Sequence, residues 1–195
     1  MTGLIILAAG ESARLGQPKQ NLVYQNKTLL QRAIETALAS VCTPVIVVLG
    51  ANEELIQPTI SQYPIKILSN SGWTEGIASS IRLGINELQQ KPEITSVILM
   101  LCDQPFVNRD LLIQLVEAST ANDFVASVYD DAVGVPVLVS SKYFEELLTL
   151  NGDEGAKKLL LKYPDKVIST PFRMGGIDID TIQDYEKLSA SGNLF

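Results

Sequence analysis

Arg14 and Lys19 lie beside Gly10 and Gly16 in a short segment near the start of the chain. Glycines let main-chain N–H groups approach an anion closely, and the two cationic side chains add positive charge. The spacing Gly-x5-Gly-x2-Lys is neither that of a Walker loop nor that of a dinucleotide-binding fingerprint. The segment is therefore either an unconventional phosphate-binding loop or an ordinary strand-to-helix turn with two surface cations.

Three carboxylates stand where they could hold a hard cation. Asp103 directly follows the apolar run 97–102, and carboxylate oxygens are typical ligands of such cations. Asp178 and Asp180 are two residues apart, so they point the same way in an extended chain. Each position has a structural alternative: Asp103 could form an Asx-turn or cap the next helix, and Asp180 or Thr181 could cap the last one.

A divalent cation would connect these two groups of residues. The chain has 15 Lys and Arg against 22 Asp and Glu, a net charge of −7, so a nucleoside triphosphate needs local positive charge to bind. Two unit charges about 4 Å apart interact by roughly 4 kcal/mol at an effective dielectric near 20. One Mg²⁺ held by Asp103 with Asp180 or Asp178 would reverse the local repulsion. The clusters together predict a Mg²⁺–triphosphate site.

The composition excludes several other chemistries. The chain has no histidine, which rules out Ser-His-Asp and Cys-His catalysis and His-containing metal sites. A pI of 4.6 without a Lys/Arg-rich run argues against nucleic acid or an anionic membrane as partner. The apolar runs are shorter than the roughly 20 residues of a membrane span, and no basic signal-peptide region opens the sequence. We expect a cytoplasmic protein with Cys42 and Cys102 as buried free thiols.

Short apolar runs alternate with segments of helical period, which predicts an α/β fold with a mostly parallel sheet and helices on both faces. The predicted strands cover 4–9, 44–50, 65–69, 97–102, 124–129, 135–139 and 166–170. The predicted helices cover 28–40, 52–61, 76–90, 109–119, 141–150, 153–163 and 181–189. The strands on either side of Asp130-Asp131 should form an antiparallel element at one side. No linker or repeat divides the chain, so we expect a single domain over 1–195.

Five motifs give the chain a family resemblance. The segment Leu7-Ala8-Ala9-Gly10 through Ser12, Arg14, Gly16 and Lys19 resembles the LAAGxSxRxGxxK signature of the MobA/MocA-like nucleotidyltransferases, which are the molybdenum cofactor cytidylyl- and guanylyltransferases. Further matches lie at 70–81, 101–105, 134–138 followed by 152–156, and 178–181. They occur in the expected order over nearly the whole chain. The resemblance implies a three-layer, Rossmann-like nucleotidyltransferase fold.

The resemblance also implies a role for each motif. The catalytic residues would be Arg14, Lys19 and Asp103. Asp103 would be the principal Mg²⁺ ligand, with Asp180 at the second metal position and Asp178 beside it. The nucleotide-binding residues would be Leu7, Ala8, Ala9, Gly10, Arg14, Gly16, Lys19, Asn70, Ser79 and Ser80. The hydroxyls of the two serines could equally cap the helix in which they stand.

The acceptor side of the site is implied by the later motifs. The substrate-binding residues would be Gly134, Pro136, Gly152, Asp153 and Gly155. Gly134 and Pro136 would shape a cleft, and the other three would place a helix N-terminus against a phosphate. Asp153 could instead be the N-cap of the helix predicted there. Trp73 suits either stacking on a pterin or packing as an anchor.

The implied reaction is transfer of CMP from CTP to the molybdenum–molybdopterin cofactor with release of pyrophosphate, dependent on Mg²⁺. Ala9 and the Ser79-Ser80 pair resemble the CTP-using branch of the family. The partners would be CTP and molybdopterin, with a recipient molybdoenzyme downstream. Three alternatives remain open: a guanylyltransferase that uses GTP, a transferase acting on a sugar phosphate or other phosphorylated acceptor, and an accessory protein that binds the cofactor without catalysis.

Overall fold

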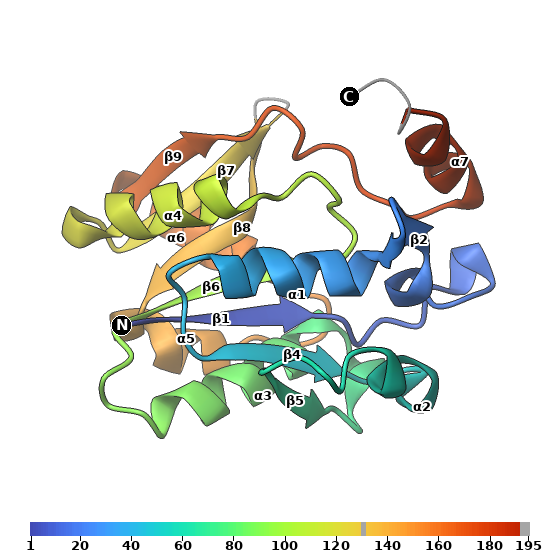
Figure 1. Cartoon of the computed structure of the whole chain (residues 1–195). Helices are drawn as coiled ribbons and strands as arrows, with labels where there is room; N and C mark the ends of the chain where they lie inside the picture. Colours follow the sequence, from blue (N-terminus) through green and yellow to red (C-terminus); the bar gives the residue numbers. More distant parts are fainter. Residues whose placement is uncertain (130–131, 192–195) are drawn as a thin grey trace.

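A seven-stranded sheet forms the centre of the computed structural model, which describes residues 1–129 and 132–191 (Figure 1). Its strands, in order across the sheet, are β5 (Lys66–Ser69), β4 (Val45–Leu49), β1 (Thr2–Leu7), β6 (Ser96–Leu101), β8 (Ala132–Ser140), β7 (Phe124–Tyr129) and β9 (Val167–Pro171). β8 runs antiparallel to both of its neighbours, whereas the other pairings are parallel. The mostly parallel sheet predicted from the sequence is confirmed.

The antiparallel element expected around residue 130 is also present. β7 and β8 pair with Phe124 opposite Val139 and Tyr129 opposite Ala132, and the register shifts between Ala126 and Ser127. The pair lies in one half of the sheet, with β9 beyond it as the edge strand. The Asp130-Asp131 connection, from which the antiparallel element was predicted, lies outside the described residues.

Helices cover both faces of the sheet. They are α1 (Leu29–Ala39), α2 (Glu53–Ile56), α3 (Ile77–Gln89), α4 (Arg109–Ala118), α5 (Phe144–Leu148), α6 (Lys157–Lys162) and α7 (Ile182–Ser191). Short 3-10 helices are η1 (Ala13–Leu15), η2 (Lys19–Asn21), η3 (Gln57–Thr59), η4 (Trp73–Glu75), η5 (Ser119–Ala121), η6 (Ser141–Tyr143) and η7 (Pro164–Lys166). Within the described residues, no helix is long and apolar enough to cross a bilayer.

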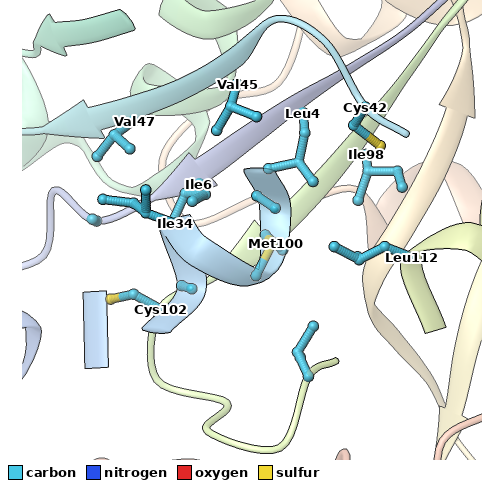
Figure 2. Close-up of a cluster of buried hydrophobic side chains, with 14 of the residues drawn as sticks. Leu4, Ile6, Ile34, Cys42, Val45, Val47, Ile98, Met100, Cys102 and Leu112 are labelled. Atoms are coloured by element: carbon cyan, nitrogen blue, oxygen red, sulfur yellow. The ribbon is translucent and has the colours of Figure 1, made fainter. Parts of the chain in front are cut away.

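Alternation along β1 divides the core between the two faces. Leu4 and Ile6 pack with α1 and α4, where Ile34 and Leu112 are fully buried (Figure 2). The intervening residues of β1 face the other way and pack with α3, α5 and α6. A parallel strand buried on both faces is apolar at every position, which is why the strand runs were continuous in the sequence. The three-layer arrangement is confirmed.

A third apolar cluster brings the end of the chain back to its beginning. A hairpin of β2 (Val23–Tyr24) and β3 (Lys27–Thr28), which sequence reasoning did not predict, precedes α1. Tyr24 packs in one cluster with Ile179 and with Leu188 of α7, and Figure 1 shows α7 beside β2. The segment before α7, which carries two of the candidate carboxylates, is thereby anchored near the loop after β1.

Three predicted helices differ from the observed ones. The helix predicted at 52–61 is α2 followed by η3, because Pro58 stands in the first turn of η3 and removes a backbone donor. The helix predicted at 141–150 begins as η6 and becomes α5. The helix predicted at 153–163 begins only at Lys157, because the preceding loop packs against the start of α3. The remaining helices lie within about two residues of their predicted ends.

Candidate active site

The candidate residues converge at the carboxyl ends of β1 and β6. The two strands are adjacent and in register, with Leu7 opposite Leu101, so the loop after β1 and the Asp103 segment emerge side by side. A cavity of about 420 Å³, called here the main cavity, lies between them. Its lining includes Leu7, Ala8, Ala9, Gly10, Lys19, Ser80, Asp103 and Asp153. This position beyond the strand ends is where ligands bind in open α/β sheets.

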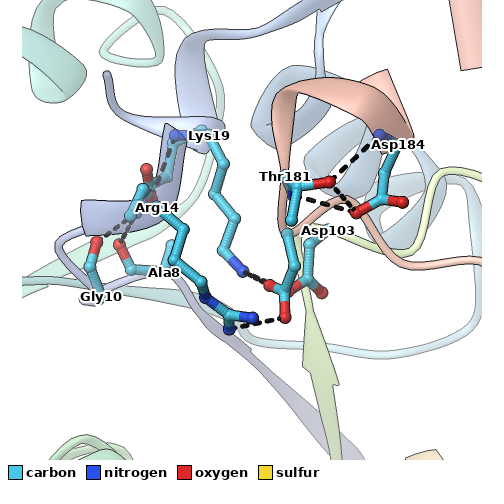
Figure 3. A network of polar contacts seen from close by, with 10 residues as sticks. Ala8, Gly10, Arg14, Lys19, Asp103, Thr181 and Asp184 are labelled. Carbon is cyan, nitrogen blue, oxygen red and sulfur yellow. Dashed lines mark hydrogen bonds and ion pairs between the residues drawn. The ribbon is translucent and has the colours of Figure 1, made fainter. Parts of the chain in front are cut away.

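A network of ion pairs forms beside the main cavity (Figure 3). The Lys19 Nζ lies 2.6 Å from Asp103 Oδ2 and 3.0 Å from Asp180 Oδ1. The Arg14 Nη2 lies 2.9 Å from Asp180 Oδ2. Four of the residues predicted from three separate segments are therefore in direct contact. In the described part of the chain the other oxygen of Asp103, Oδ1, is buried without a hydrogen-bond partner.

Burial and ion pairing act against each other in this network. Burial alone would lower the pKa of Lys19, but the Asp103 and Asp180 carboxylates outweigh it and raise that pKa well above its usual range. Burial opposes ionisation of Asp180, yet hydrogen bonds from Lys19 and Arg14 leave its pKa below the usual value. Incomplete solvation and the nearby Asp103 and Asp180 carboxylates raise the pKa of Asp178. Asp103 and Asp180 thus stabilise the charged form of Lys19, and Lys19 and Arg14 stabilise the charged form of Asp180.

A buried glutamine fixes the loop that follows β1. Gln20 is 1% exposed, and its Nε2 donates to the carbonyl oxygens of Ala8 at 2.8 Å and Gly10 at 3.0 Å. The backbone N–H of Lys19 donates to Ser12 Oγ at 3.1 Å. These bonds turn two carbonyl oxygens toward the protein amide, so they do not repel an anion in the cavity. Nothing in the spacing of the sequence singled out Gln20.

The structural alternatives for the carboxylates can now be decided. Asn108, not Asp103, is the N-cap of α4, because its Oδ1 accepts the Leu111 N–H at 2.9 Å. Thr181 and Asp184 form reciprocal bonds at the start of α7, with the Asp184 N–H donating to Thr181 Oγ1 at 3.2 Å. Asp103 and Asp180 therefore have no capping role; Asp103 lines the main cavity, and Asp180 contacts Lys19, which also lines it.

Backbone and side-chain hydrogen bonds hold the segment with Asp178 and Asp180 against the residues that follow β6. The Ile179 N–H donates to the carbonyl oxygen of Asp103 at 3.0 Å. Gln104 Nε2 donates to the carbonyl oxygen of Gly175 at 2.9 Å. Ile179 is fully buried, so the backbone that carries the carboxylates on either side of it is fixed. The two carboxylates have different surroundings. Asp180 meets the cations, whereas Asp178 lines a different cavity.

The segment at 70–81 forms part of the main cavity wall, but only one of its three predicted nucleotide-binding residues is in that wall. Asn70 Nδ2 donates to the hydroxyls of Ser79 at 2.8 Å and Ser80 at 2.9 Å, and all three residues are buried. Ser79 also donates to the carbonyl oxygen of Gly76 at 2.8 Å. Of these three polar residues, Ser80 lines the main cavity. Asn70 and Ser79 shape the start of α3 behind it.

The candidate acceptor residues divide between two cavities. Gly134 and Gly155 line a second cavity of about 290 Å³, called here the apolar cavity because Leu, Ile and Val side chains form most of its wall. Asp153 lines the main cavity instead. Among the described residues, Pro136 and Gly152 line neither. Ala156 is the N-cap residue of α6, so the expectation that Asp153 caps that helix is wrong.

Two aromatic residues on these walls were not among the predicted site residues. Trp73 lines the main cavity, and a Cβ at Gly50 would lie 2.6 Å from the Trp73 Cβ. Trp73 thus packs against Gly50 and also forms part of the main cavity wall. Tyr129 lines the apolar cavity and also a third cavity of about 290 Å³, called here the acidic cavity because Asp103 and Asp178 line it. Sequence reasoning placed Tyr129 only at the end of a strand.

The family model described as the MobA-like NTP transferase domain matches residues 4–167, which include the loop after β1 and Asp103. The chain belongs to the MobA-like NTP transferase family. It is therefore a nucleotidyltransferase, as the resemblance of its motifs implied. The match ends before Asp178 and Asp180, so these two carboxylates are placed by the structure and by their own motif.

Members and relatives of the MobA-like family match almost the full chain. Molybdenum cofactor cytidylyltransferase of Escherichia coli is 26% identical over 93% of this chain and 92% of its own length. Nicotine blue oxidoreductase of Paenarthrobacter nicotinovorans is 29% identical over 94% of each chain. The crystal structure of Rv0371c from Mycobacterium tuberculosis is 30% identical, with a TM-score of 0.86 over 97% of this chain and 98% of that one. A structure of Rv0371c in complex with manganese is 27% identical, with a TM-score of 0.83 over the same shares.

Proposed function

We propose that the chain transfers CMP from CTP to the phosphate of the molybdenum–molybdopterin cofactor, releasing pyrophosphate in a Mg²⁺-dependent reaction. The observation that carries this proposal is the contact of Lys19 with Asp103 and Asp180, the first two of which line the main cavity. This contact brings the proposed phosphate-binding and metal-binding groups together. The E. coli relative, named a molybdenum cofactor cytidylyltransferase, supports this choice of nucleotide and acceptor.

The carboxylates present suit a divalent cation. Asp103 keeps one buried oxygen without a partner in the described residues, and Asp180 lies on the other side of the same ammonium group. No group of three or more acidic or Cys side chains gathers as a metal site within the residues the structure describes. Mg²⁺ usually binds one or two carboxylates together with substrate phosphates. Asp103 and Asp180 would hold it, and it would neutralise charge on the phosphates. The structure of the relative Rv0371c in complex with manganese supports the presence of a divalent cation.

Arg14 and Lys19 would contact the phosphates of CTP. Both cations are paired with carboxylates of the site, so each would only need to change its partner from a carboxylate to a phosphate of the nucleotide. Catalysis at phosphorus depends mainly on positioning and on neutralising charge. Gln20 assists by holding the Ala8 and Gly10 carbonyl oxygens away from the anion.

The transfer itself needs no protein base. A phosphate oxygen of the acceptor forms a bond to the α-phosphorus of CTP while the bond from that phosphorus to the bridging oxygen of the β-phosphate breaks. Pyrophosphate leaves with the electron pair of that bond. A phosphate monoester has a second pKa of about 6 and is largely ionised at neutral pH, which agrees with a chain that has no histidine.

The apolar cavity favours a ring-bearing acceptor over a sugar phosphate. It shares Leu7, Ile77 and Leu101 with the main cavity, so a molecule bound there reaches the same strand ends. A sugar would leave its hydroxyl groups unpaired against Leu, Ile and Val side chains, and an unpaired buried polar group is costly. A pterin can place the faces of its flat ring system against these side chains, while the nitrogen and oxygen atoms at its edge still need hydrogen-bond partners.

Pyrophosphate release from purified protein tests the proposal. The assay compares CTP, GTP and ATP, each with Mg²⁺ and with either molybdenum–molybdopterin or a panel of sugar phosphates. We expect release with CTP and the pterin. Exclusive use of GTP would replace the cytidylyl assignment by a guanylyl one, and release only with sugar phosphates would replace the acceptor.

Two further outcomes would reject catalysis of this kind. Tight binding of the pterin without pyrophosphate would indicate an accessory protein that delivers the cofactor to a recipient molybdoenzyme. The name of the Paenarthrobacter relative indicates redox chemistry, so the same samples are assayed for oxidation of NADH and NADPH. We expect none, because the Gly-x5-Gly-x2-Lys loop lacks the dinucleotide fingerprint.

A further inference from the structure

Three cavities meet at the carboxyl end of β6. Leu101 lines the main, apolar and acidic cavities, and Asp103 lines the main and acidic ones. A group that binds in the acidic cavity therefore lies beside a proposed metal ligand. If the main cavity holds the nucleotide, its reaction partner must approach Asp103 from the other two cavities.

Tyr129, the last residue of β7, stands between those two cavities. It lines both of them together with Leu101, Ala132 and Val135. Within the described residues it is not part of the main cavity wall. A change at Tyr129 should therefore affect a molecule bound in the apolar and acidic cavities without affecting one bound in the main cavity.

The neighbouring backbone is built closely around the Tyr129 ring. A Cβ at Gly134 would lie 2.1 Å from the Tyr129 hydroxyl oxygen, and a Cβ at Gly175 would lie 2.2 Å from its Cδ1. A methyl group at either position would force the Tyr129 ring to move. The Phe172 ring meets Tyr129 edge to face, with the centroids 6.2 Å apart and the planes at 89°. The ring is held from three sides and remains half-buried at the cavities.

The hydroxyl of Tyr129 is suited to donate a hydrogen bond. Burial raises its pKa; a hydrogen bond with Gln104 lowers it in part, and the Asp178 and Asp103 carboxylates contribute smaller upward shifts. The phenol is therefore neutral at physiological pH. Beside two carboxylates, a neutral donor can bind an anionic phosphorylated compound where a further carboxylate would repel it.

We propose that Tyr129 is a specificity-determining contact for the acceptor, a phosphorylated compound with a flat ring system. The Tyr129 ring forms one wall for that ring system in the apolar cavity. Its hydroxyl donates a hydrogen bond to the acceptor on the side of the acidic cavity. This inference rests on the proposed function and adds the residue that selects the acceptor.

Two variants separate the ring from the hydroxyl. Tyr129→Leu removes the aromatic wall, and Tyr129→Phe removes the hydroxyl while keeping the packing against Gly134 and Gly175. Tyr63→Leu is the matched control, because Tyr63 is also half-buried and lines none of the three cavities among the described residues. The KM of molybdenum–molybdopterin is measured by pyrophosphate release. The Kd of CTP is measured by the fluorescence of Trp73, the single tryptophan of the chain and part of the main cavity wall.

We expect Tyr129→Leu to raise the KM of the acceptor at least about tenfold and Tyr129→Phe to raise it about threefold, in line with an aromatic contact and a neutral hydrogen bond. The Kd of CTP should stay within about twofold in both variants, and Tyr63→Leu should leave both constants within about twofold. An unchanged acceptor KM in Tyr129→Leu, or equal losses in acceptor KM and CTP affinity, would overturn the inference.

The remaining outcomes are also decisive. If Tyr129→Leu does not fold, Tyr129→Phe decides the matter, and an unchanged acceptor KM in that variant refutes the contact. If the unsubstituted protein releases no pyrophosphate with any acceptor, the proposed function fails and the inference fails with it. Normal turnover of the unsubstituted protein with unaffected Tyr129 variants refutes the role of Tyr129 alone.

Discussion

Lys19 holds the position in which the site most needs positive charge. Its side chain is 19% exposed and that of Asp103 is 9% exposed, so water screens their attraction less than it would at the surface. Removal of one partner from such a pair leaves the other charge buried and uncompensated. Loss of one partner of the pair should therefore lower stability as well as affect the proposed chemistry.

Substitution of Lys19 separates these two contributions. Lys19→Met should lower turnover at least about 100-fold, comparable to the loss of one charge-stabilising donor in other active sites, and should lower the melting temperature. Lys19→Met combined with Asp103→Asn should melt at a higher temperature than Lys19→Met alone, because the uncompensated carboxylate is gone. Activity and thermal melts of the three proteins test both points. Normal turnover of Lys19→Met would exclude Lys19 from the site.

Gly10 offers a cleaner test of the loop, because a Cβ there would meet nothing within 4 Å. Gly10→Ala should change the free energy of unfolding by less than about 0.5 kcal/mol. It should nevertheless weaken CTP binding about tenfold, or about 1.4 kcal/mol, because the added methyl group keeps the phosphates from the main chain. Denaturant unfolding and Trp73 fluorescence titration measure the two effects. Unchanged CTP affinity would show that no phosphate approaches this glycine.

The charged residues of the site were predictable from the sequence, whereas their supports were not. Lys19, Asp103 and Asp180 belong to short sequence motifs that carry charged side chains. Such residue types indicate anion or metal binding even before the structure is known. Gln20 and Gln104 bond to carbonyl oxygens, the latter 71 residues away. Such a bond depends on tertiary packing and leaves no periodic signal. Tertiary packing also explains why Asp153 does not cap α6: the loop that contains it packs against the start of α3.

At the scale of elements, the start of α3 and the loop at 150–156 are fitted to each other. The Ala78 N–H donates to the carbonyl oxygen of Gly152 at 3.0 Å. Gly76 has a φ of +118°, and a Cβ on it would lie 2.4 Å from the Gly152 carbonyl group. This contact places Asp153 on the main cavity. Gly76 is therefore required both by its backbone conformation and by its neighbour.

Gly76→Ala should lower the free energy of unfolding by about 2–4 kcal/mol, because it adds strain at a positive φ and a clash with backbone. Gly155→Ala is the matched control, since a Cβ at Gly155 meets nothing within 4 Å, and it should cost less than about 1 kcal/mol. Denaturant unfolding of both variants checks the difference. Equal stabilities would contradict the close packing of the two segments.

The strands of the seven-stranded sheet and the longer helices were predicted well from the sequence, whereas the two-residue strands of the β2–β3 hairpin were not. The central strands β4 and β6 have continuous apolar runs, and the long helices α1, α3 and α4 have a helical period. The β2–β3 hairpin has two residues in each strand, with Gln25 and Asn26 at φ of +50° and +65° in its turn. A strand of two residues is too short for any alternation to be visible.

The whole molecule places both cysteines in the interior. Cys42 is 6% exposed and Cys102 is 4% exposed, and both are free thiols in the described structure. One sheet takes strands from Thr2 to Pro171. The sequence prediction of a single domain over 1–195 then implies that both thiols become accessible in the same unfolding event.

Thiol labelling during denaturant unfolding tests that prediction. We expect neither cysteine to react with a thiol reagent under native conditions, and both to become reactive in one transition that coincides with the loss of circular dichroism. Labelling of Cys42 and Cys102 is followed separately by mass spectrometry. Two transitions, with one cysteine exposed well before the other, would indicate units that unfold independently.

The acidic charge of the molecule agrees with a site that handles anions through a few placed cations. The net charge is −7, yet Arg14 and Lys19 meet at the end of β1 with the carboxylates that would hold Mg²⁺. The proposed reaction moves one phosphorus atom from a nucleotide to an acceptor, and the fate of that atom can be followed directly.

The most direct measurement therefore uses CTP labelled at the α-phosphorus, incubated with Mg²⁺, molybdenum–molybdopterin and the protein. We predict that the label appears in a pterin dinucleotide in an amount equal to the pyrophosphate released, and that Asp103→Asn abolishes both. Label that remains in CTP, or that appears only in free CMP, would contradict nucleotidyl transfer to this acceptor.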